Sequence, residues 1–529
     1  MAQTLTKNHL RWDPALAMSP LRVLTLLLVA VLLVSPYSTA TRVFNPLEHS
    51  GPASPYFDAP SQSNINTDLP EGCTVDQAAY ILRHGARYPE PGSFNGWKGL
   101  FAKFQNATYT ARGPLSFIPA WTLPVDDEPH QPLFLSSTGA GEAFRLGVEL
   151  RKRYGLTKGG SNFTVWTAGQ QRCIDTAVYF LRGYLSQGNY VSDPSLNRGT
   201  VITLVDSSVN TTFADSLTPS ASCPAYSEFT PAGSANSDKF RASVRDKVAK
   251  RLNGFLEGLM LNASDIGVMQ DLCGFGFEVS GDKRFCDIFQ EAEWLDYEYA
   301  HDLNYYYGAG PGNPISATTG YPWVKAISDL FAVGPGETVE NGTLIPPPLI
   351  MTFTHDNNIP PIISALGLWN STTGSSEKEE TIYPLPITKR VDDPRRMFRS
   401  SYLVSFFGNI ALERMKCVIG GPTLEEQREK GVSHQANIFG GSVNNAGMGK
   451  SKVFVRVRAN NAPIPIPGCV SGPGMTCPLE EFLDYVNRPR KVASGDFVDI
   501  CGLNGVQGAV SEMKFLTTTG DGTTFAGIV

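Results

Sequence analysis

The stretch YILRHGARYPEP, residues 80–91, joins a short apolar run directly to two arginines and a histidine. The run AAYIL at residues 78–82 is compatible with a buried strand of a parallel sheet. Polar residues that follow such a strand lie in the loop at its carboxyl end, where Gly85 lets the backbone approach a ligand. Two guanidiniums beside an imidazole lower its proton affinity and attract an anion. The stretch therefore indicates either a salt-bridged turn or a site that holds a negatively charged group.

The motif favours the anion site. Arg83 and Arg87 present planar guanidinium groups that suit phosphate oxygens, and Pro89 stiffens the exit of the loop. At this chain's composition, the pattern R-H-G-x-R-x-P arises by accident with odds on the order of one in ten thousand. The net charge of the chain is −6, which disfavours nucleic acid or an anionic membrane surface as the main partner. An anionic substrate must therefore be attracted by a local basic site.

Strand, loop and helix alternate along the chain, which predicts an α/β sheet with functional loops at the carboxyl ends of its strands. Expected strands cover residues 78–82, 162–167, 349–353, 401–407 and 452–457, and expected helices cover residues 137–154 and 172–185. Thr138 is the expected N-cap of the first helix, and Phe144 and Leu150 suit its buried face. Residues 238–334 show few strand signals and are expected to be helical.

The simplest organisation is one α/β domain interrupted by a mainly helical insertion. The expected segments are a signal peptide at residues 1–40, an extended arm at 41–72, the first part of the α/β domain at 73–190, the insertion at 191–335, and the second part with C-terminal loops at 336–529. Arg22 precedes an apolar run that is too short to span a bilayer comfortably, and cleavage is expected near Ala40. The chain is thus expected to be secreted without stable membrane insertion; an uncleaved signal anchor is the alternative.

Secretion would make the nine cysteines potential disulfide partners, and an odd number leaves at least one of them over in a monomer. The chain has no C-x-x-C pair, so a zinc ribbon or a thioredoxin motif is not supported. N-glycans are also expected, because six glycosylation motifs are spread along the chain. They begin at Asn106, Asn162, Asn210, Asn262, Asn341 and Asn370.

The opening stretch resembles the signature of the histidine acid phosphatases, branch two of the histidine phosphatase superfamily, which includes fungal phytases. Three dispersed segments strengthen the resemblance. LIMTFTHDNNI supplies the His355–Asp356 pair, and VWTAGQQRCIDTA supplies Arg172 at the start of a helix. EWLDYEYAHDLNYYYGAGPGNP looks like the fungal phytase segment that precedes a Gly-Asn-Pro turn. The resemblance covers most of residues 70–510 and is weakest after Cys417.

The resemblance implies a phosphoglycerate-mutase-like α/β sandwich domain with an inserted, mainly helical domain. It also implies a phosphomonoesterase that needs no metal or other cofactor and acts on small phosphorylated substrates. His84 would be the nucleophile that forms a phosphohistidine, and Asp356 would protonate the leaving group. The phosphoryl oxygens would be bound by the remaining site residues, Arg83, Arg87, Arg172 and His355.

The same resemblance suggests four disulfides and leaves Cys173 over as a buried thiol. The implied pairs are Cys73–Cys417, Cys223–Cys501, Cys273–Cys286 and Cys469–Cys477. Without the resemblance, His355 could be a structural histidine, Asp356 a helix-starting acid, and Arg172 a solvated side chain. His301 and Glu293, among aromatic residues of the insertion, are interpreted as structural.

The substrate is harder to predict. Fungal phytases usually carry lysine just before the tyrosine pair of the YYG segment, where this chain has Asn304 and Tyr305. The extra positive charge expected for a hexaphosphate is therefore missing, which favours a broad phosphomonoesterase that includes phytate among its substrates. The alternatives are a dedicated 3-phytase, a catalytically silent phosphate-binding glycoprotein, and a phosphoryl-transfer enzyme such as a mutase. The sequence leaves the oligomeric state open.

Overall fold

The computed structural model describes residues 43–61, 65–155, 163–186, 199–205, 212–336, 346–370, 382–419, 450–517 and 525–528. The predicted signal peptide and the motifs at Asn162, Asn210 and Asn341 lie outside these ranges. The features below belong to the unit that begins at Pro46. No helix in the described ranges is long and apolar enough to cross a membrane.

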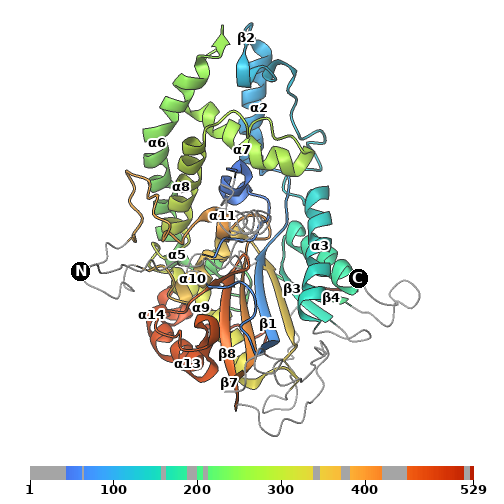
Figure 1. The fold of residues 1–529 in the computed structure, drawn as a ribbon, viewed down its shortest axis with the longest axis vertical. Coiled ribbons are helices and arrows are strands. Elements are labelled where there is room, and N and C mark those ends of the chain that lie inside the picture. Colours follow the sequence, from blue (N-terminus) through green and yellow to red (C-terminus); the bar gives the residue numbers. More distant parts are fainter. Residues whose placement is uncertain are drawn as a thin grey trace, which may run out of the picture. The chain divides into compact units, whose positions relative to one another are not determined.

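A mixed sheet forms the centre of the fold, in the order β10-β8-β7-β1-β6-β3-β4-β11, with β9 paired to β8 (Figure 1). Its four parallel strands are β1 (Cys73–Arg83), β6 (Leu349–Thr354), β3 (Phe163–Ala168) and β4 (Gly199–Leu204). The antiparallel strands are β7 (Asn409–Ile419), β8 (Lys450–Ala459), β9 (Ala462–Ile464), β10 (Cys477–Pro478) and β11 (Phe525–Ile528). The predicted strands at 78–82, 162–167, 349–353 and 452–457 are confirmed.

Strand β1 is buried on both faces, because successive side chains point to opposite sides of a sheet. Tyr80 and Leu82 pack with α3 (Ser137–Tyr154) and α4 (Gln171–Leu185) on one side. Ile81 packs on the other side, in the core that contains residues of α9 (Ser316–Val333), α10 (Pro360–Ala365) and α13 (Leu479–Tyr485). Helices therefore cover both faces, and the predicted α/β sandwich is confirmed.

A group of helices lies beyond the carboxyl ends of β1 and β6, drawn above the sheet in Figure 1. It comprises α2 (Pro91–Asn106), α6 (Pro231–Asn253), α7 (Ala263–Ser280) and α8 (Glu291–Gly308), with α6 packed against both α7 and α8. The short helix α5 (Pro224–Phe229) leads into α6. Two elements inside the range predicted for the insertion belong to the sheet and its covering layer instead, namely β4 and α9. The division into two domains stays a prediction.

Short elements complete the described chain. They are η2 (Pro46–His49), η3 (Gly51–Ala53), β2 (Thr110–Ala111), η4 (Gly113–Leu115), η5 (Ile118–Ala120), η7 (Pro219–Ser222), β5 (Leu256–Glu257), η8 (Asp356–Asn358), α11 (Ser400–Leu403), η10 (Pro473–Met475), η11 (Val486–Arg490), α14 (Lys491–Ser494) and α15 (Phe497–Ile500). The strand predicted at residues 401–407 is wrong, since α11 and a turn occupy it. The Asp302 carboxylate accepts hydrogen bonds from the backbone N–H and the hydroxyl of Ser400 at 2.6 and 2.7 Å, which fixes the start of α11.

The four disulfides implied by the family resemblance are all present. Cys73 and Cys417 are directly opposite each other in the antiparallel pairing of β1 with β7. Cys173 stays outside the disulfides and is buried, with its sulfur 3.5 Å from the carbonyl oxygen of Thr354. The disulfides thus leave one buried thiol beside the end of β6.

Helix α3 begins against the loop that follows β1. Its N-cap is Ser136 and not Thr138, because the Ser136 hydroxyl accepts from the backbone N–H of Gly139 at 3.0 Å and donates to the carbonyl of Ala86 at 3.1 Å. Phe144 is also not on the buried face, as it is 39% exposed. A Cβ at Gly139 would lie 2.1 Å from the Ala86 carbonyl oxygen, so the helix approaches the loop more closely than any other residue would permit.

We therefore expect Gly139→Ala to destabilise the protein by about 2 kcal/mol, because the methyl group would push α3 away from the loop. Gly141→Ala in the same helix is the matched control. A Cβ at Gly141 meets nothing within 4 Å, so helix propensity should leave that variant as stable as the parent or more stable by up to about 1 kcal/mol. Denaturant unfolding of both variants measures the difference. Equal stabilities would contradict the close approach.

Candidate active site

The parallel pairing of β1 with β6 brings two of the sequence motifs together. Arg83 lies opposite Thr354 at the end of both strands, and the backbone N–H of His84 donates to the Thr354 carbonyl at 3.0 Å. His84 and His355 leave their strands side by side, with ring centroids 5.6 Å apart. Since β3 also runs parallel beside β6, Arg172 at the start of α4 reaches the same edge of the sheet. The candidate site thus lies where the parallel strands end.

His84 is held as a neutral imidazole with a defined tautomer. Its Nδ1 lies 2.9 Å from the Gly85 carbonyl oxygen, which can only accept, so Nδ1 carries the proton and Nε2 keeps its lone pair. The backbone N–H of Gly85 donates to the Thr176 hydroxyl at 3.0 Å, which fixes the loop. Burial and the charges of three arginines, first Arg83, lower the pKa of His84 well below its usual value. An unprotonated Nε2 is the form that a nucleophile requires.

The side chains of Arg83 and Arg87 are almost fully buried. Arg83 donates to the carbonyl oxygens of Pro52 and Val404, and its Nη2 lies 3.2 Å from Oδ2 of Asp356. Arg87 donates to the Tyr88 carbonyl at 3.0 Å. The Nε atoms of both arginines are buried and have no hydrogen-bond partner in the described part of the chain. The charges of both arginines act on His84, so they favour an anion beside it.

Arg87 also makes contacts outside the loop. Its Nη2 lies 2.8 Å from the Glu90 carboxylate, and its guanidinium carbon lies 5.6 Å from the centre of the Phe275 ring on α7. Burial and the neighbouring charge of Arg83 lower the pKa of Arg87 to about 10, so it remains charged at acidic and neutral pH. The helices beyond the sheet therefore help to place this cation.

Arg172 and His355 form a second pair of donors. Nη2 of Arg172 lies 3.3 Å from Nδ1 of His355, so Nδ1 accepts and Nε2 of His355 carries the proton. Burial and the Arg172 charge lower the pKa of His355 to about 3. The sulfur of Cys173 lies 3.6 Å from the same Nδ1 atom. Nε of Arg172 is buried and likewise has no partner among the described residues.

Asp356 completes the cluster at its more open side, with a side chain that is 24% exposed. Its Oδ1 accepts from the backbone N–H of Asn357 at 2.9 Å, and its Oδ2 accepts from the Tyr305 hydroxyl at 2.8 Å. Burial raises the pKa of Asp356, but the charges of Arg83 and Arg87 outweigh burial and lower it to about 2. The contact with Tyr305 was not predicted from the sequence, which marked this position only for its lack of a lysine.

All six residues predicted for the site therefore lie together. A neutral imidazole with a free lone pair, three guanidiniums and a carboxyl group can bind a phosphate ester and transfer its phosphoryl group. In the described ranges, no group of three or more His, Cys, Asp or Glu side chains is placed to hold a metal ion.

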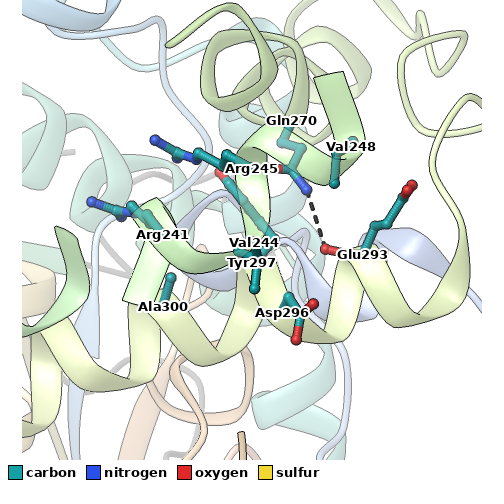
Figure 2. Close-up of a pocket in the computed structure, with 9 residues that line it drawn as sticks. All are labelled: Arg241, Val244, Arg245, Val248, Gln270, Glu293, Asp296, Tyr297 and Ala300. Atoms are coloured by element: carbon teal, nitrogen blue, oxygen red, sulfur yellow. Dashed lines mark hydrogen bonds between the residues drawn. The ribbon is translucent and has the colours of Figure 1, made fainter. Parts of the chain in front are cut away.

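Glu293 and His301 lie elsewhere, in the group of helices beyond the sheet. Glu293 lines a small pocket between α6, α7 and α8, where its backbone carbonyl accepts from Gln270 at 3.2 Å (Figure 2). Its carboxylate accepts from Arg251 at 2.7 Å. The ring of His301 packs 4.6 Å from the ring of Tyr297. These contacts are those of structural side chains, as their interpretation from the sequence stated.

In sequence and in structure, the chain is similar to known phosphatases and phytases. The family described as histidine phosphatase superfamily (branch 2) matches residues 74–436. An acid phosphatase of Komagataella pastoris is 29% identical over 471 residues, which cover 87% of each chain. A phytase of Candida albicans is 28% identical over 489 residues, which cover 91% of this chain and 92% of the relative. The crystal structure of a phytase from D. castellii superimposes with a TM-score of 0.70 at 25% identity, covering 91% of this chain and 92% of that one.

The lowered pKa of His355 predicts how the stability of the folded protein changes with pH. Between the usual histidine pKa of about 6.5 and the folded value of about 3, the unfolded chain binds a proton that the folded chain does not. Stability is therefore lost as the pH falls through this window. In His355→Asn, the loss between pH 7 and pH 4.5 should be smaller than in the parent by on the order of 2 kcal/mol.

Denaturant unfolding at the two pH values measures this difference. His130→Asn is the control, because His130 is an exposed histidine far along the chain from the site, with a side chain that is 78% exposed. An equal loss in His355→Asn and the parent would show that His355 is not held neutral by its surroundings.

Proposed function

The chain belongs to the histidine phosphatase superfamily, branch 2, and we propose that it is a secreted acid phosphomonoesterase that works through a phosphohistidine on His84. One observation carries the proposal. Nδ1 of His84 is occupied by the Gly85 carbonyl, so the lone pair of Nε2 is left for the substrate. The charges of Arg83, Arg87 and Arg172 all act on His84, so these arginines favour a phosphoryl group beside it.

In the first step, Nε2 of His84 attacks phosphorus, and the bond between phosphorus and the ester oxygen breaks. The electron pair of that bond stays on the ester oxygen, which takes the proton of Asp356. Arg83, Arg87, Arg172 and the Nε2–H of His355 stabilise the negative charge on the transferred group. In the second step, water attacks the phosphohistidine, Asp356 takes a proton from the water, and His84 is released with inorganic phosphate.

The proton-donor role requires that the substrate changes the protonation of Asp356. Its pKa in the free site is about 2, because the arginine charges outweigh burial. A bound phosphate ester adds negative charge beside the same arginines, so it offsets their effect and raises the pKa of Asp356. At acidic pH, part of the enzyme–substrate complex then carries a protonated Asp356. This protonated complex is the form that reacts.

We assign a broad range of phosphate monoesters to the site, with phytate among them. The relatives include an acid phosphatase and two phytases, which leaves both substrate classes open. Tyr305 brings no positive charge to the site, and its hydroxyl is engaged with Asp356. Phytate, a hexaphosphate, therefore meets no additional cationic side chain at this position. A dedicated 3-phytase is the second candidate, and the similarity to the D. castellii phytase favours it.

Secretion and N-glycosylation are also proposed. The apolar segment before Ala40 supports a cleaved signal peptide, and four disulfides suit an oxidising compartment. Asn106 and Asn262 are exposed, so both glycosylation motifs are accessible. The Asn262 side chain caps α7 through its oxygen, which leaves its nitrogen for a glycan.

His84→Ala should abolish phosphate release, because no other group in the cluster can replace the Nε2 lone pair. Release from phytate and from an aryl phosphate, measured side by side across acidic pH, tests the mechanism and compares the two substrates. His130→Ala, which removes an exposed histidine, should match the parent on both. Substantial turnover by folded His84→Ala would exclude the phosphohistidine. A parent that binds phosphate without turning over either substrate would be the silent glycoprotein.

Asp356→Asn should separate substrates by leaving group. An aryl phosphate with a good leaving group needs little protonation, so it should still phosphorylate His84. An alkyl phosphate should lose about a hundredfold or more in rate, since general acid catalysis typically contributes that much. Single-turnover release of the alcohol from both substrates gives the comparison. Equal losses would contradict the role of Asp356.

A further inference from the structure

Helix α8 brings Tyr305 to the proposed proton donor across 51 residues of sequence. The phenol donates to Oδ2 of Asp356 at 2.8 Å, and Tyr305 also packs against two clusters of the hydrophobic core. Asp356 itself begins η8, directly after β6. The hydrogen bond therefore connects the last turn of α8 to the carboxyl group of Asp356, which lies just beyond the end of β6.

The two oxygens of Asp356 have different surroundings. Oδ2 receives the Tyr305 hydroxyl and lies 3.2 Å from Nη2 of Arg83. Among the described residues, Oδ1 receives one hydrogen bond, from the backbone N–H of Asn357. A carboxyl group takes up a proton more readily on the oxygen with fewer donors, because each donor stabilises the negative charge. The proton of Asp356 is thus directed to Oδ1.

The end of α8 is held in place by hydrogen bonds, so Tyr305 can hold the Asp356 carboxyl group in a fixed orientation. The Tyr305 carbonyl accepts from the backbone N–H groups of Ala309 and Gly310, at 3.0 and 2.7 Å. One turn later, the Asn313 side chain donates to the Gly308 carbonyl at 2.9 Å. Burial and the nearby Asp356 charge raise the pKa of Tyr305 well above its usual value. The phenol therefore keeps its proton and remains a donor throughout the working pH range.

We propose that Tyr305 is the positioning residue of the proton donor: together with Arg83 it fixes Oδ2, so that Oδ1 of Asp356 carries the proton given to the leaving group. The inference rests on the proposed function, in which Asp356 is the acid. The proton moves from Oδ1 to the ester oxygen as the bond between phosphorus and that oxygen breaks. Tyr305 itself exchanges no proton with the substrate.

Tyr305→Phe removes the donor and keeps the ring. Without it, the carboxyl group can turn, so the rate constant kcat for an alkyl phosphate should fall about tenfold. The value for an aryl phosphate with a good leaving group should stay within about twofold of the parent. Loss of a hydrogen bond to the charged form also raises the pKa of Asp356, so the alkaline limb of the kcat profile should move to higher pH.

The charged and titratable groups around Asp356 decide how that limb is interpreted. They are Arg83 at the end of β1, Arg87 in the loop that follows, the adjacent His355, and Tyr305 from α8. Arg87 keeps its charge below a pKa of about 10, and His355 is neutral above a pKa of about 3. A shift of the alkaline limb in Tyr305→Phe therefore reports on Asp356.

Tyr307→Phe is the matched control. It removes a hydroxyl from the same helix, which donates to the Leu385 carbonyl at 2.6 Å and not to the site. This variant should change neither the ratio of alkyl to aryl rates nor the pH profile. If Tyr305→Phe lowers both rates equally, or leaves the alkaline limb in place, the positioning role is overturned.

The double variant Tyr305→Phe/Asp356→Asn separates this inference from the proposed function. If Asp356 is the acid and Tyr305 acts through it, Tyr305→Phe should add no further loss in the Asp356→Asn background. A further loss would mean that Tyr305 acts on the substrate directly, which overturns the inference alone. If Asp356→Asn keeps the parent's rate on alkyl phosphates, Asp356 is not the acid, and the proposed function is contradicted independently of Tyr305.

Discussion

The parallel pairing of β1 with β6 is the constraint on which the site depends. It places Arg83 opposite Thr354, so the next residues of both strands, His84 and His355, leave the sheet at the same edge. A shift of the register by one residue would turn every side chain of β1 to the other face of the sheet. Because both faces of β1 are packed against helices, the register is strongly specified. The core of the sandwich thereby fixes the spacing of His84 and His355.

Without a bound anion, the buried positive charges of the candidate site destabilise the folded protein. Arg83 and Arg87 are almost fully buried near a third arginine, and burial penalises such charges. Part of that cost is offset by carbonyl oxygens, namely those of Pro52, Val404 and Tyr88, and part by carboxylates. Burial and the same charges lower the pKa of His84 well below its usual value. In the proposed mechanism, one arrangement therefore serves both the binding of phosphate and the reactivity of His84.

The sequence predicted the parts of the fold that have strong local signals. Short apolar runs identified β1, β3, β6 and β8, and the dispersed motifs identified the six site residues. Strand β7 was missed, because its interior reads LERMK and the charged Glu413 and Arg414 hide a buried strand. Those charges are buried in ion pairs with Arg456, Arg458 and Asp76, which only the folded chain brings near. The contact between Tyr305 and Asp356 was not predicted for the same reason, since it joins distant elements of the chain.

The arrangement of the strands also has a consequence for how the protein is made. The central strand β1 is synthesised early, but both of its sheet neighbours, β6 and β7, come from the far part of the chain. The disulfide that joins β1 to β7 spans 344 residues. A nascent chain therefore cannot complete its central sheet until β7 has emerged, and such non-local pairing is slow. A chain that ends before β6 would carry His84 without His355 and Asp356 beside it.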